Sequence, residues 1–216
     1  MSELRKYNIH PKKENFKVLI KELIKNYQIE QVIETGSFDG LGSTKVFAET
    51  GLSVISLECN FVHYLTAKQN LSEYTNVKLI NGFSLNKKDM INFIKTDSFL
   101  LDKDYYDNNN ILSDNKNHVD FYIWELNNNS ENTTEENILL NLVNNNTNQL
   151  IFLDSAGGVG FMEFNELLKI EKKYLKNKLI LLDDVFHVKH HRSHKFLIDN
   201  NIPFKIFDNR MIYFKL

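Results

Sequence analysis

The chain alternates short apolar runs with stretches whose apolar residues recur at helical spacing. Runs of this kind predict strands, and the periodic stretches between them predict helices. The expected parallel strands are residues 31–34, 53–58, 77–81, 149–154 and 178–183. The expected helices are residues 15–27, 43–50, 62–71, 135–143, 160–174 and 190–200. The alternation is typical of an α/β, doubly wound fold in which helices cover both faces of a parallel sheet.

The end of the chain differs in kind from the rest. Residues 203–207 and 210–215 are two strand-like runs joined by Asp208-Asn209, a pair suited to a tight turn. We therefore expect an antiparallel hairpin at the C-terminal end of a mostly parallel sheet.

Residues 96–148 interrupt the alternation with a polar loop at 102–117, an apolar run at 119–126 and a spacer rich in Asn and Glu. This segment is too short for a core of its own, so we expect an insertion rather than a second domain. Trp124 could line a pocket, but we expect it to anchor the insertion. The division that follows is an N-terminal helical segment at 1–28 and a main domain at 29–216.

Composition and charge exclude several classes of protein. Lys and Arg number 26 against 28 Asp and Glu, so there is no excess positive charge for binding a phosphate backbone. Cys59 is the single cysteine, which excludes an intramolecular disulfide and a cysteine-based zinc cluster. Residues 1–13 lack the apolar segment of a signal peptide, and nowhere do 18 apolar residues run together. We expect a soluble cytoplasmic protein with no membrane or nucleic-acid partner.

A glycine-bearing loop follows the first expected strand and leads into a helix. Its spacing is Gly36-x3-Gly40-x-Gly42, which differs from the G-x-G-x-x-G of dinucleotide-binding folds. Glycines at such a turn let the backbone approach a ligand closely, next to the exposed N–H groups of the helix. They could also be plain loop glycines, but the chain has only 8 in total and three fall here. Glu58, at the end of the second strand, stands where doubly wound folds place an acid that accepts hydrogen bonds from ribose hydroxyls.

The chain at this point resembles the class I S-adenosylmethionine-dependent methyltransferases. Their first motif, E-x-G-x-x-x-G-x-G, is matched at each position, and the resemblance extends from about residue 29 to the C-terminus apart from 96–148. It implies a seven-stranded sheet with a terminal hairpin, S-adenosylmethionine as cofactor, and an adenine site just after the third strand. The residues implied to hold the cofactor are Glu34, Gly36, Ser37, Gly40, Gly42, Glu58, Gly82, Phe83 and Ser84.

Acidic residues end the fourth and fifth strands. Asp154 follows one, and Asp183-Asp184 follows the other, so all three should meet at one edge of the sheet. Their repulsion calls for a cation, and oxygen ligands suit Mg²⁺. The pattern is similar to metal-dependent O-methyltransferases and to cephalosporin-hydroxylase-like methyltransferases, in which His closely follows the Asp-Asp pair. The alternative is that some of these acids cap helices or bind the cofactor.

Four of the seven histidines fall within residues 187–194. His187 comes three residues after Asp184, where a neutral imidazole could take the proton of a substrate hydroxyl. Lys189 is a second candidate for the base, and Asp154 counts among the catalytic candidates. We expect His190 and His194 to lie on solvated surface.

These features predict O-methylation of a small-molecule acceptor such as a sugar or another polyol, assisted by a divalent cation. A homodimer is a candidate assembly. Two alternatives stay open: a non-catalytic binding or partner subunit of the same fold, and a methyltransferase acting on protein or nucleic acid. No N/D-P-P-aromatic motif follows the fourth strand, where the chain reads Asp154-Ser155-Ala156-Gly157, which disfavours methylation of DNA amino groups.

Overall fold

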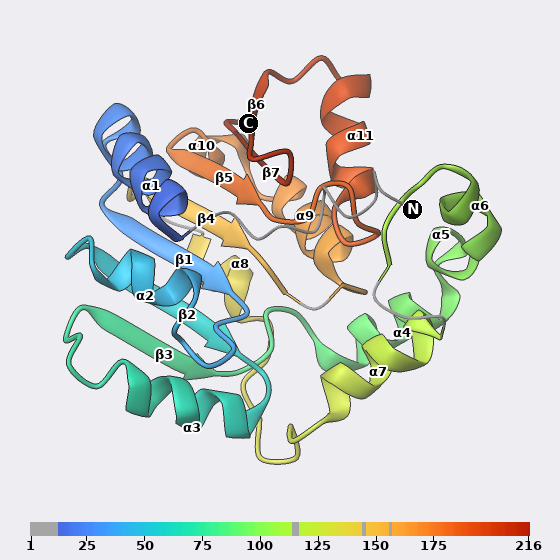
Figure 1. Cartoon of the computed structure of the whole chain (residues 1–216), viewed down its shortest axis with the longest axis horizontal. Helices are drawn as coiled ribbons and strands as arrows, with labels where there is room; N and C mark the ends of the chain where they lie inside the picture. Colours follow the sequence, from blue (N-terminus) through green and yellow to red (C-terminus); the bar gives the residue numbers. More distant parts are fainter. Residues whose placement is uncertain (1–12, 114–116, 144–145, 156) are drawn as a thin grey trace.

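The computed structural model describes residues 13–113, 117–143, 146–155 and 157–216. They form a seven-stranded sheet with the order β3-β2-β1-β4-β5-β7-β6 (Figure 1). Its strands are β1 (Gln31–Thr35), β2 (Ser53–Glu58), β3 (Val77–Asn81), β4 (Gln149–Leu153), β5 (Lys178–Leu182), β6 (Phe204–Phe207) and β7 (Met211–Phe214). The first five strands pair in parallel, and β7 runs antiparallel to both β5 and β6. The predicted fold class is confirmed.

The helices agree with the sequence prediction in most places. They are α1 (Lys13–Tyr27), α2 (Ser43–Ala48), α3 (Phe61–Asn70), α4 (Lys87–Thr96), α5 (Ser98–Leu101), α6 (Lys103–Asn108), α7 (His118–Asn127), α8 (Ile138–Val143), α9 (Gly160–Leu168), α10 (Lys172–Leu175) and α11 (His191–Asp199). The expected single helix at 160–174 is divided into α9 and α10, because Glu171 has an extended backbone. The expected polar loop at 102–117 contains α6, which begins where the Asp102 side chain accepts a hydrogen bond from the Tyr105 N–H.

The sheet is buried on both faces, which explains why β4 and β5 are apolar at almost every position. Successive side chains on a strand point to opposite faces. Val32 and Leu150 therefore pack toward α1 and α2, while Ile33 and Ile151 pack toward α8, α9 and α11. Helix α1 thus belongs to the packing of the sheet, whereas residues 1–12 lie outside the described residues.

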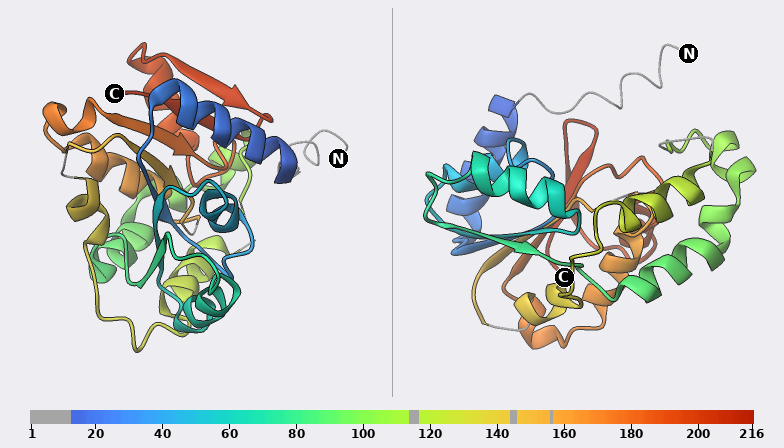
Figure 2. Two further views of the ribbon diagram at one scale, coloured as in Figure 1. Left: turned by 90° about the vertical axis from the view of Figure 1, so that its left-hand side faces the viewer. Right: turned by 90° about the horizontal axis from the view of Figure 1, so that it is seen from below.

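A third apolar cluster lies beyond the carboxyl ends of the strands, where α4 and α7 pack side by side (Figure 2). It joins Met90 of α4, Tyr106 of α6 and Tyr122 of α7 to Val159 and Val188, which follow β4 and β5. The inserted segment therefore shares its core with the rest of the molecule. It stands next to the edge of the sheet at which ligands bind in doubly wound folds.

The terminal hairpin turns where the sequence predicts it. Asp208 and Asn209 have φ values of 49° and 50°, and the Arg210 N–H donates to the Phe207 carbonyl at 3.1 Å. Because β7 runs antiparallel to β5, the start of β7 lies next to the end of β5.

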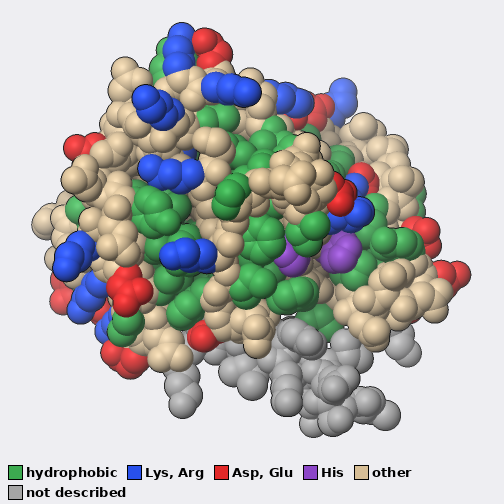
Figure 3. Space-filling model, turned by 90° about the horizontal axis from the view of Figure 1, so that it is seen from above, with side chains coloured by type: hydrophobic (Ala, Val, Ile, Leu, Met, Phe, Trp, Pro, Cys, Tyr) green, Lys and Arg blue, Asp and Glu red, His purple; other side chains and the backbone are tan. Residues whose placement is uncertain are grey.

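Two further observations concern the surface and the helix lengths. Within the described residues, no helix combines the length and apolar character needed to cross a membrane. On the face shown in Figure 3, lysine and arginine side chains lie separated by uncharged and hydrophobic ones.

Candidate active site

A cavity of about 640 Å³ opens at the carboxyl edge of the sheet. Small-molecule sites commonly have volumes of about 300–1,000 Å³. It lies where the strand order reverses between β1 and β4, the position at which doubly wound folds bind ligands. Its lining includes Gly36, Glu58 and Phe83 at the ends of β1, β2 and β3, and Asp154, His187 and Lys189, which follow β4 and β5. Residues from the ends of five strands and from α3, α4 and α7 thus meet around a single space.

Glu58 lies in the cavity wall, as the sequence predicts, and only 8% of its surface is exposed. Its Oε2 accepts the Phe38 N–H at 2.7 Å, and its Oε1 accepts the Asn60 N–H at 2.9 Å. Burial raises the pKa of this carboxyl to about 7, although the two backbone hydrogen bonds oppose the shift. A carboxylate oxygen has two lone pairs, so each oxygen could accept a further hydrogen bond from a ligand hydroxyl.

Glu34 lies outside the cavity lining, although the motif match implies that it holds the cofactor. It is fully buried, and it accepts hydrogen bonds from the hydroxyls of Ser43, Thr44 and Ser56. The last two are each 2.6 Å long. Its carboxylate therefore ties the start of α2 to β2 and supports the glycine loop from behind.

The three glycines of the loop have different structural roles. Gly36 has a φ of +85°, and a Cβ there would lie 2.6 Å from the Asp154 carbonyl oxygen. Gly40 has a φ of +78°, and a Cβ would meet the side chain of Leu71, which follows α3, at 2.8 Å. Gly42 has a negative φ and no atom within 4 Å of a Cβ position. Of these three glycines, only Gly36 lines the cavity.

Ser37, between these glycines, is buried and lies outside the cavity lining. Within the described part of the chain, no atom forms a hydrogen bond with its Oγ. A buried hydroxyl of this kind is uncommon, because it loses the hydrogen bonds that water would provide.

Gly82, Phe83 and Ser84 line the cavity at the end of β3, where the resemblance places the adenine. The Phe83 N–H donates to the Glu135 carbonyl at 2.8 Å, which fixes this turn against the segment before α8. A Cβ on Gly82 would lie 2.1 Å from the Ile138 side chain. The close packing of this segment therefore favours glycine at position 82.

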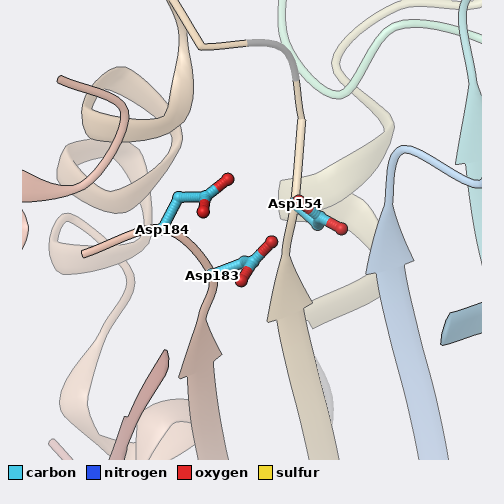
Figure 4. A group of neighbouring side chains, drawn as sticks. All are labelled: Asp154, Asp183 and Asp184. Carbon is cyan, nitrogen blue, oxygen red and sulfur yellow. The ribbon is translucent and has the colours of Figure 1, made fainter. Parts of the chain in front are cut away.

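The three predicted acids converge at the tips of β4 and β5 (Figure 4). One ligand oxygen from each of Asp154, Asp183 and Asp184 lies within 4.8 Å of the others. The predicted convergence is confirmed.

Two buried cations already compensate this acidic cluster. Arg210 donates from Nε and Nη2 to both oxygens of Asp183 at 2.6 Å, and its Nη2 lies 3.0 Å from Asp184. The Lys189 ammonium lies 2.5 Å from Asp154 and 3.5 Å from Asp184. This makes three carboxylates and two fixed positive charges in one buried group.

Burial and ion pairing act in opposite directions on the pKa of each of these groups. Burial would raise the pKa of Asp183, but the hydrogen bonds and charge of Arg210, together with Lys189, hold it well below its usual range. Burial raises the pKa of Asp154 well above its usual range, and Lys189 only partly opposes this effect. Burial would lower the pKa of Lys189, but Asp154 and the two neighbouring aspartates raise it above its ordinary value.

This arrangement bears on the predicted Mg²⁺ site. Both oxygens of Asp183 accept from a guanidinium, and a divalent ion between Asp154 and Asp184 would have to displace the Lys189 ammonium. The residues as arranged do not fit a divalent ion. Metal binding therefore stays a prediction, and no step below uses a metal.

His187 lines the cavity where the sequence predicts a base. Its Nδ1 accepts the Lys189 backbone N–H at 3.2 Å. That bond uses the lone pair of Nδ1, so a neutral imidazole carries its proton on Nε2. In this tautomer His187 is a hydrogen-bond donor at Nε2, which disfavours the role of base at that nitrogen.

The expectation that His190 is solvated is wrong. His190 is 0% exposed and packs against Gly160, and burial lowers the pKa of its imidazole to about 3. The expectation is also wrong for His194, which is half-buried between the rings of Phe186 and Phe204.

Sequence reasoning missed two contributors to this region and favoured the role of anchor for a third, Trp124. Arg210 could have been found, because an antiparallel hairpin places the start of its second strand next to the acids that end β5. Glu163 of α9 is buried and accepts hydrogen bonds from Thr35 at 3.3 Å and Ser155 at 2.6 Å, and no sequence signal marks it. Trp124 lines the cavity and is 54% exposed, so it is not the buried anchor we expected.

Comparisons with known proteins agree with the observed fold. The sequence matches no protein-family model and no curated protein. Among solved structures, the chain is similar to a Staphylococcus aureus protein assigned as a caffeoyl-CoA O-methyltransferase, with 16% identity and a TM-score of 0.53. The alignment covers 100% of this chain and 88% of that one.

Two further structures contain cofactor or its product. The Bacillus cereus O-methyltransferase in complex with SAH is 15% identical with a TM-score of 0.51, over 100% of this chain and 86% of that one. TomG from Streptomyces achromogenes, an O-methyltransferase involved in tomaymycin synthesis, was solved with SAM. It is 12% identical with a TM-score of 0.51, over 96% of this chain and 82% of that one. At these identities the similarity shows the fold alone, which is that of the class I S-adenosylmethionine-dependent methyltransferases.

Proposed function

We propose that this protein transfers a methyl group from S-adenosylmethionine to an oxygen of a small molecule. The observation that carries the proposal is the single cavity that joins the glycine loop and Glu58 to the Asp154–Lys189 pair and His187. A cofactor and an acceptor bound in one cavity can be aligned for direct transfer.

The cofactor half of the cavity has suitable chemistry for a nucleoside ligand. Glu58 presents carboxylate oxygens that can accept hydrogen bonds from ribose hydroxyls, and Phe83 supplies an apolar surface beside them. Gly36 lets the backbone lie close to a ligand, since no side chain fits at that position. When bound, S-adenosylmethionine supplies a methyl group activated by its sulfonium.

The acceptor half must hold a hydroxyl oxygen and remove its proton. We assign proton removal to Asp154, since burial raises the proton affinity of this cavity-lining carboxylate. Lys189 holds Asp154 in place through a 2.5 Å ion pair. His187 lines the same cavity; we assign its Nε2–H to orienting the acceptor oxygen after an adjustment of the side chain, since this atom is buried in the structure. Its role as the base is the alternative.

A metal-assisted form of the same reaction would require a divalent ion to displace the Lys189 ammonium from Asp154 and Asp184, although the three acidic side chains lie close enough to share an ion. The ion pairs of Lys189 and Arg210 favour the metal-free form, in which these cations stabilise the carboxylates. The two forms differ in whether a chelator reduces turnover.

The test is mass spectrometry of pools of small hydroxyl compounds incubated with the protein and isotope-labelled S-adenosylmethionine, with and without chelator. We expect labelled product in both conditions, and a loss of about 10²–10⁴-fold in Asp154→Asn, the range for removing one acid–base group. Loss of product with chelator would establish the metal-assisted form. Absence of labelled product from every pool would contradict the proposal.

A further inference from the structure

One wall of the cavity is formed by a single stripe of α7. Leu126 lines the cavity, as do Phe121, Trp124, Glu125 and the C-cap residue Asn128, and these last four are spaced at i, i+3, i+4 and i+7. Such positions lie on one face of a helix. His118, Tyr122 and Leu126, spaced at i, i+4 and i+8, form the buried stripe of the same helix. The stripe that faces the cavity is therefore held by a packed one.

The aromatic part of this wall is exposed. The rings of Phe121 and Trp124 stack with centroids 5.8 Å apart and planes inclined by 23°. The Trp124 residue is 54% exposed, although burial of an indole is favourable. A pair of stacked rings that lines a cavity offers a flat apolar surface for a ring of similar size.

Polar groups on the same wall suit hydroxyl groups. Glu125 offers carboxylate oxygens that accept hydrogen bonds, and Asn128 offers an amide that can both donate and accept. A flat aromatic surface flanked by such groups recognises a ring that carries hydroxyls.

The charge of the cavity restricts the acceptor further. Four carboxylates line it: Glu58, Glu125, Asp154 and Asp184. Among the residues that the structure describes, Lys189 is the only lysine or arginine in the lining, and its ammonium is already paired with Asp154. An anionic group would lose its hydration and meet excess negative charge.

We infer that the acceptor is an uncharged or cationic ring compound bearing hydroxyl groups, such as a neutral sugar or an amino sugar, bound against Trp124. Acceptors that carry phosphate or carboxylate are excluded. This inference rests on the proposed function, and it names the substrate class of that site.

Trp124 is the only tryptophan of the chain, so its fluorescence reports ligand binding at this wall directly. The probes are matched sets of small hydroxylated rings in neutral, amino, phosphorylated and carboxylated forms. They are titrated in the presence of S-adenosylhomocysteine, so that no methyl transfer occurs. We expect saturable changes in fluorescence with neutral or amino probes, and binding at least tenfold weaker for the phosphorylated or carboxylated form of the same ring.

Variants of Trp124 and Glu125 test whether the probes bind at the wall formed by α7. Trp124→Ala should raise the KM of an accepted probe by tenfold or more with little change in S-adenosylhomocysteine affinity, whereas Trp124→Phe should retain most of the binding. Glu125→Gln should improve binding of the phosphorylated probe severalfold. Tyr105→Ala is the matched control, since Tyr105 is an exposed aromatic on α6 outside the cavity lining.

The outcomes separate this inference from the proposed function. Preferred binding of anionic probes, or no fluorescence change with any neutral or amino probe, would overturn the acceptor class. The labelled-methyl assay would still detect transfer to some other acceptor in that case. Failure of the methyl assay with intact fluorescence binding would instead overturn the reaction.

Discussion

Three buried glutamates show how the surroundings of a residue determine its role. Glu34 accepts hydrogen bonds from three protein hydroxyls, and Glu163 accepts hydrogen bonds from the hydroxyls of Thr35 and Ser155, so both residues fix loops. Glu58 accepts two backbone N–H groups but lies in the cavity wall, where it can still accept from a ligand. The motif places Glu34 and Glu58 in the same cofactor site, whereas the structure gives only Glu58 access to the cavity.

Cofactor affinity should depend on pH through Glu58. Ribose hydroxyls donate to the ionised carboxyl, so binding should tighten as pH rises through the Glu58 pKa of about 7. Calorimetry of S-adenosylhomocysteine binding at about pH 6 and about pH 8 measures this change, and proton release should accompany binding at the lower value. Glu58→Gln should bind weakly at both values. An equal dependence on pH in that variant would assign the titration to another group.

The raised pKa of Glu58 also makes the stability of the fold depend on pH, but stability falls where cofactor affinity rises. The pKa of Glu58 is raised from 4.5 to about 7 in the folded protein, so the native state binds a proton that the unfolded chain has released. The stabilisation from this residue is fully present below pH 4.5 and is lost as pH rises through about 7.

Substitutions of His187 separate its two possible roles, a hydrogen-bond donor and a base. If Nε2–H orients the acceptor oxygen, His187→Gln keeps a donor and should retain clearly more turnover than His187→Ala. If His187 is the base, both variants should fall by about 10²–10⁴-fold. Steady-state kinetics with an accepted substrate measures the difference. Lys195→Ala is the control, since Lys195 lies on α11 with a side chain that is largely exposed.

At the scale of elements, the loop between β1 and α2 combines positions that differ in their need for glycine. Gly36→Ala forces a side chain into the left-handed region and into contact with the Asp154 carbonyl. We expect it to lower the free energy of unfolding by at least about 1–2 kcal/mol and to weaken cofactor binding. Gly42→Ala, the matched control, should leave both nearly unchanged because its Cβ meets open space. Thermal unfolding and calorimetry measure the two effects, and equal losses in the two variants would contradict this account.

The sheet and its loops could be predicted because the strands are short runs rich in apolar residues that end at or just before a polar or glycine residue. The convergence of the acids that follow β4 and β5 could also be predicted, because parallel strands end at one edge of the sheet. The wall formed by α7 could not be predicted, because residues 119–126 are a largely apolar run whose two acids, Asp120 and Glu125, do not show which side meets the cavity. The burial of His190 was hidden for a similar reason: its contact with Gly160 depends on how α9 packs.

At the scale of the whole molecule, the terminal hairpin completes the acidic cluster. Arg210 is at the start of β7, yet its guanidinium binds the Asp183 carboxylate that ends β5. Removing one partner of a buried ion pair leaves the other charge without compensation. The hairpin is thus required for the charge balance of the site as well as for the edge of the sheet.

Arg210→Met should lower the free energy of unfolding by about 3–5 kcal/mol, the range for breaking a buried ion pair. The double variant Arg210→Met/Asp183→Asn should recover much of that loss, because no unpaired charge remains at position 183. Denaturant unfolding of the wild type, both single variants and the double variant gives the coupling. Additive losses would contradict the pairing of these two side chains.

Calorimetric titration of the wild-type protein with S-adenosylmethionine at about pH 8, in parallel with Glu58→Gln, measures whether the cavity binds the cofactor through Glu58. The account predicts saturable binding to the wild type and a loss of about tenfold or more in the variant, because charge-assisted hydrogen bonds contribute about 1.5–3 kcal/mol each. No binding to a folded wild-type protein, or equal affinity in the folded variant, would contradict a cofactor site built on this cavity.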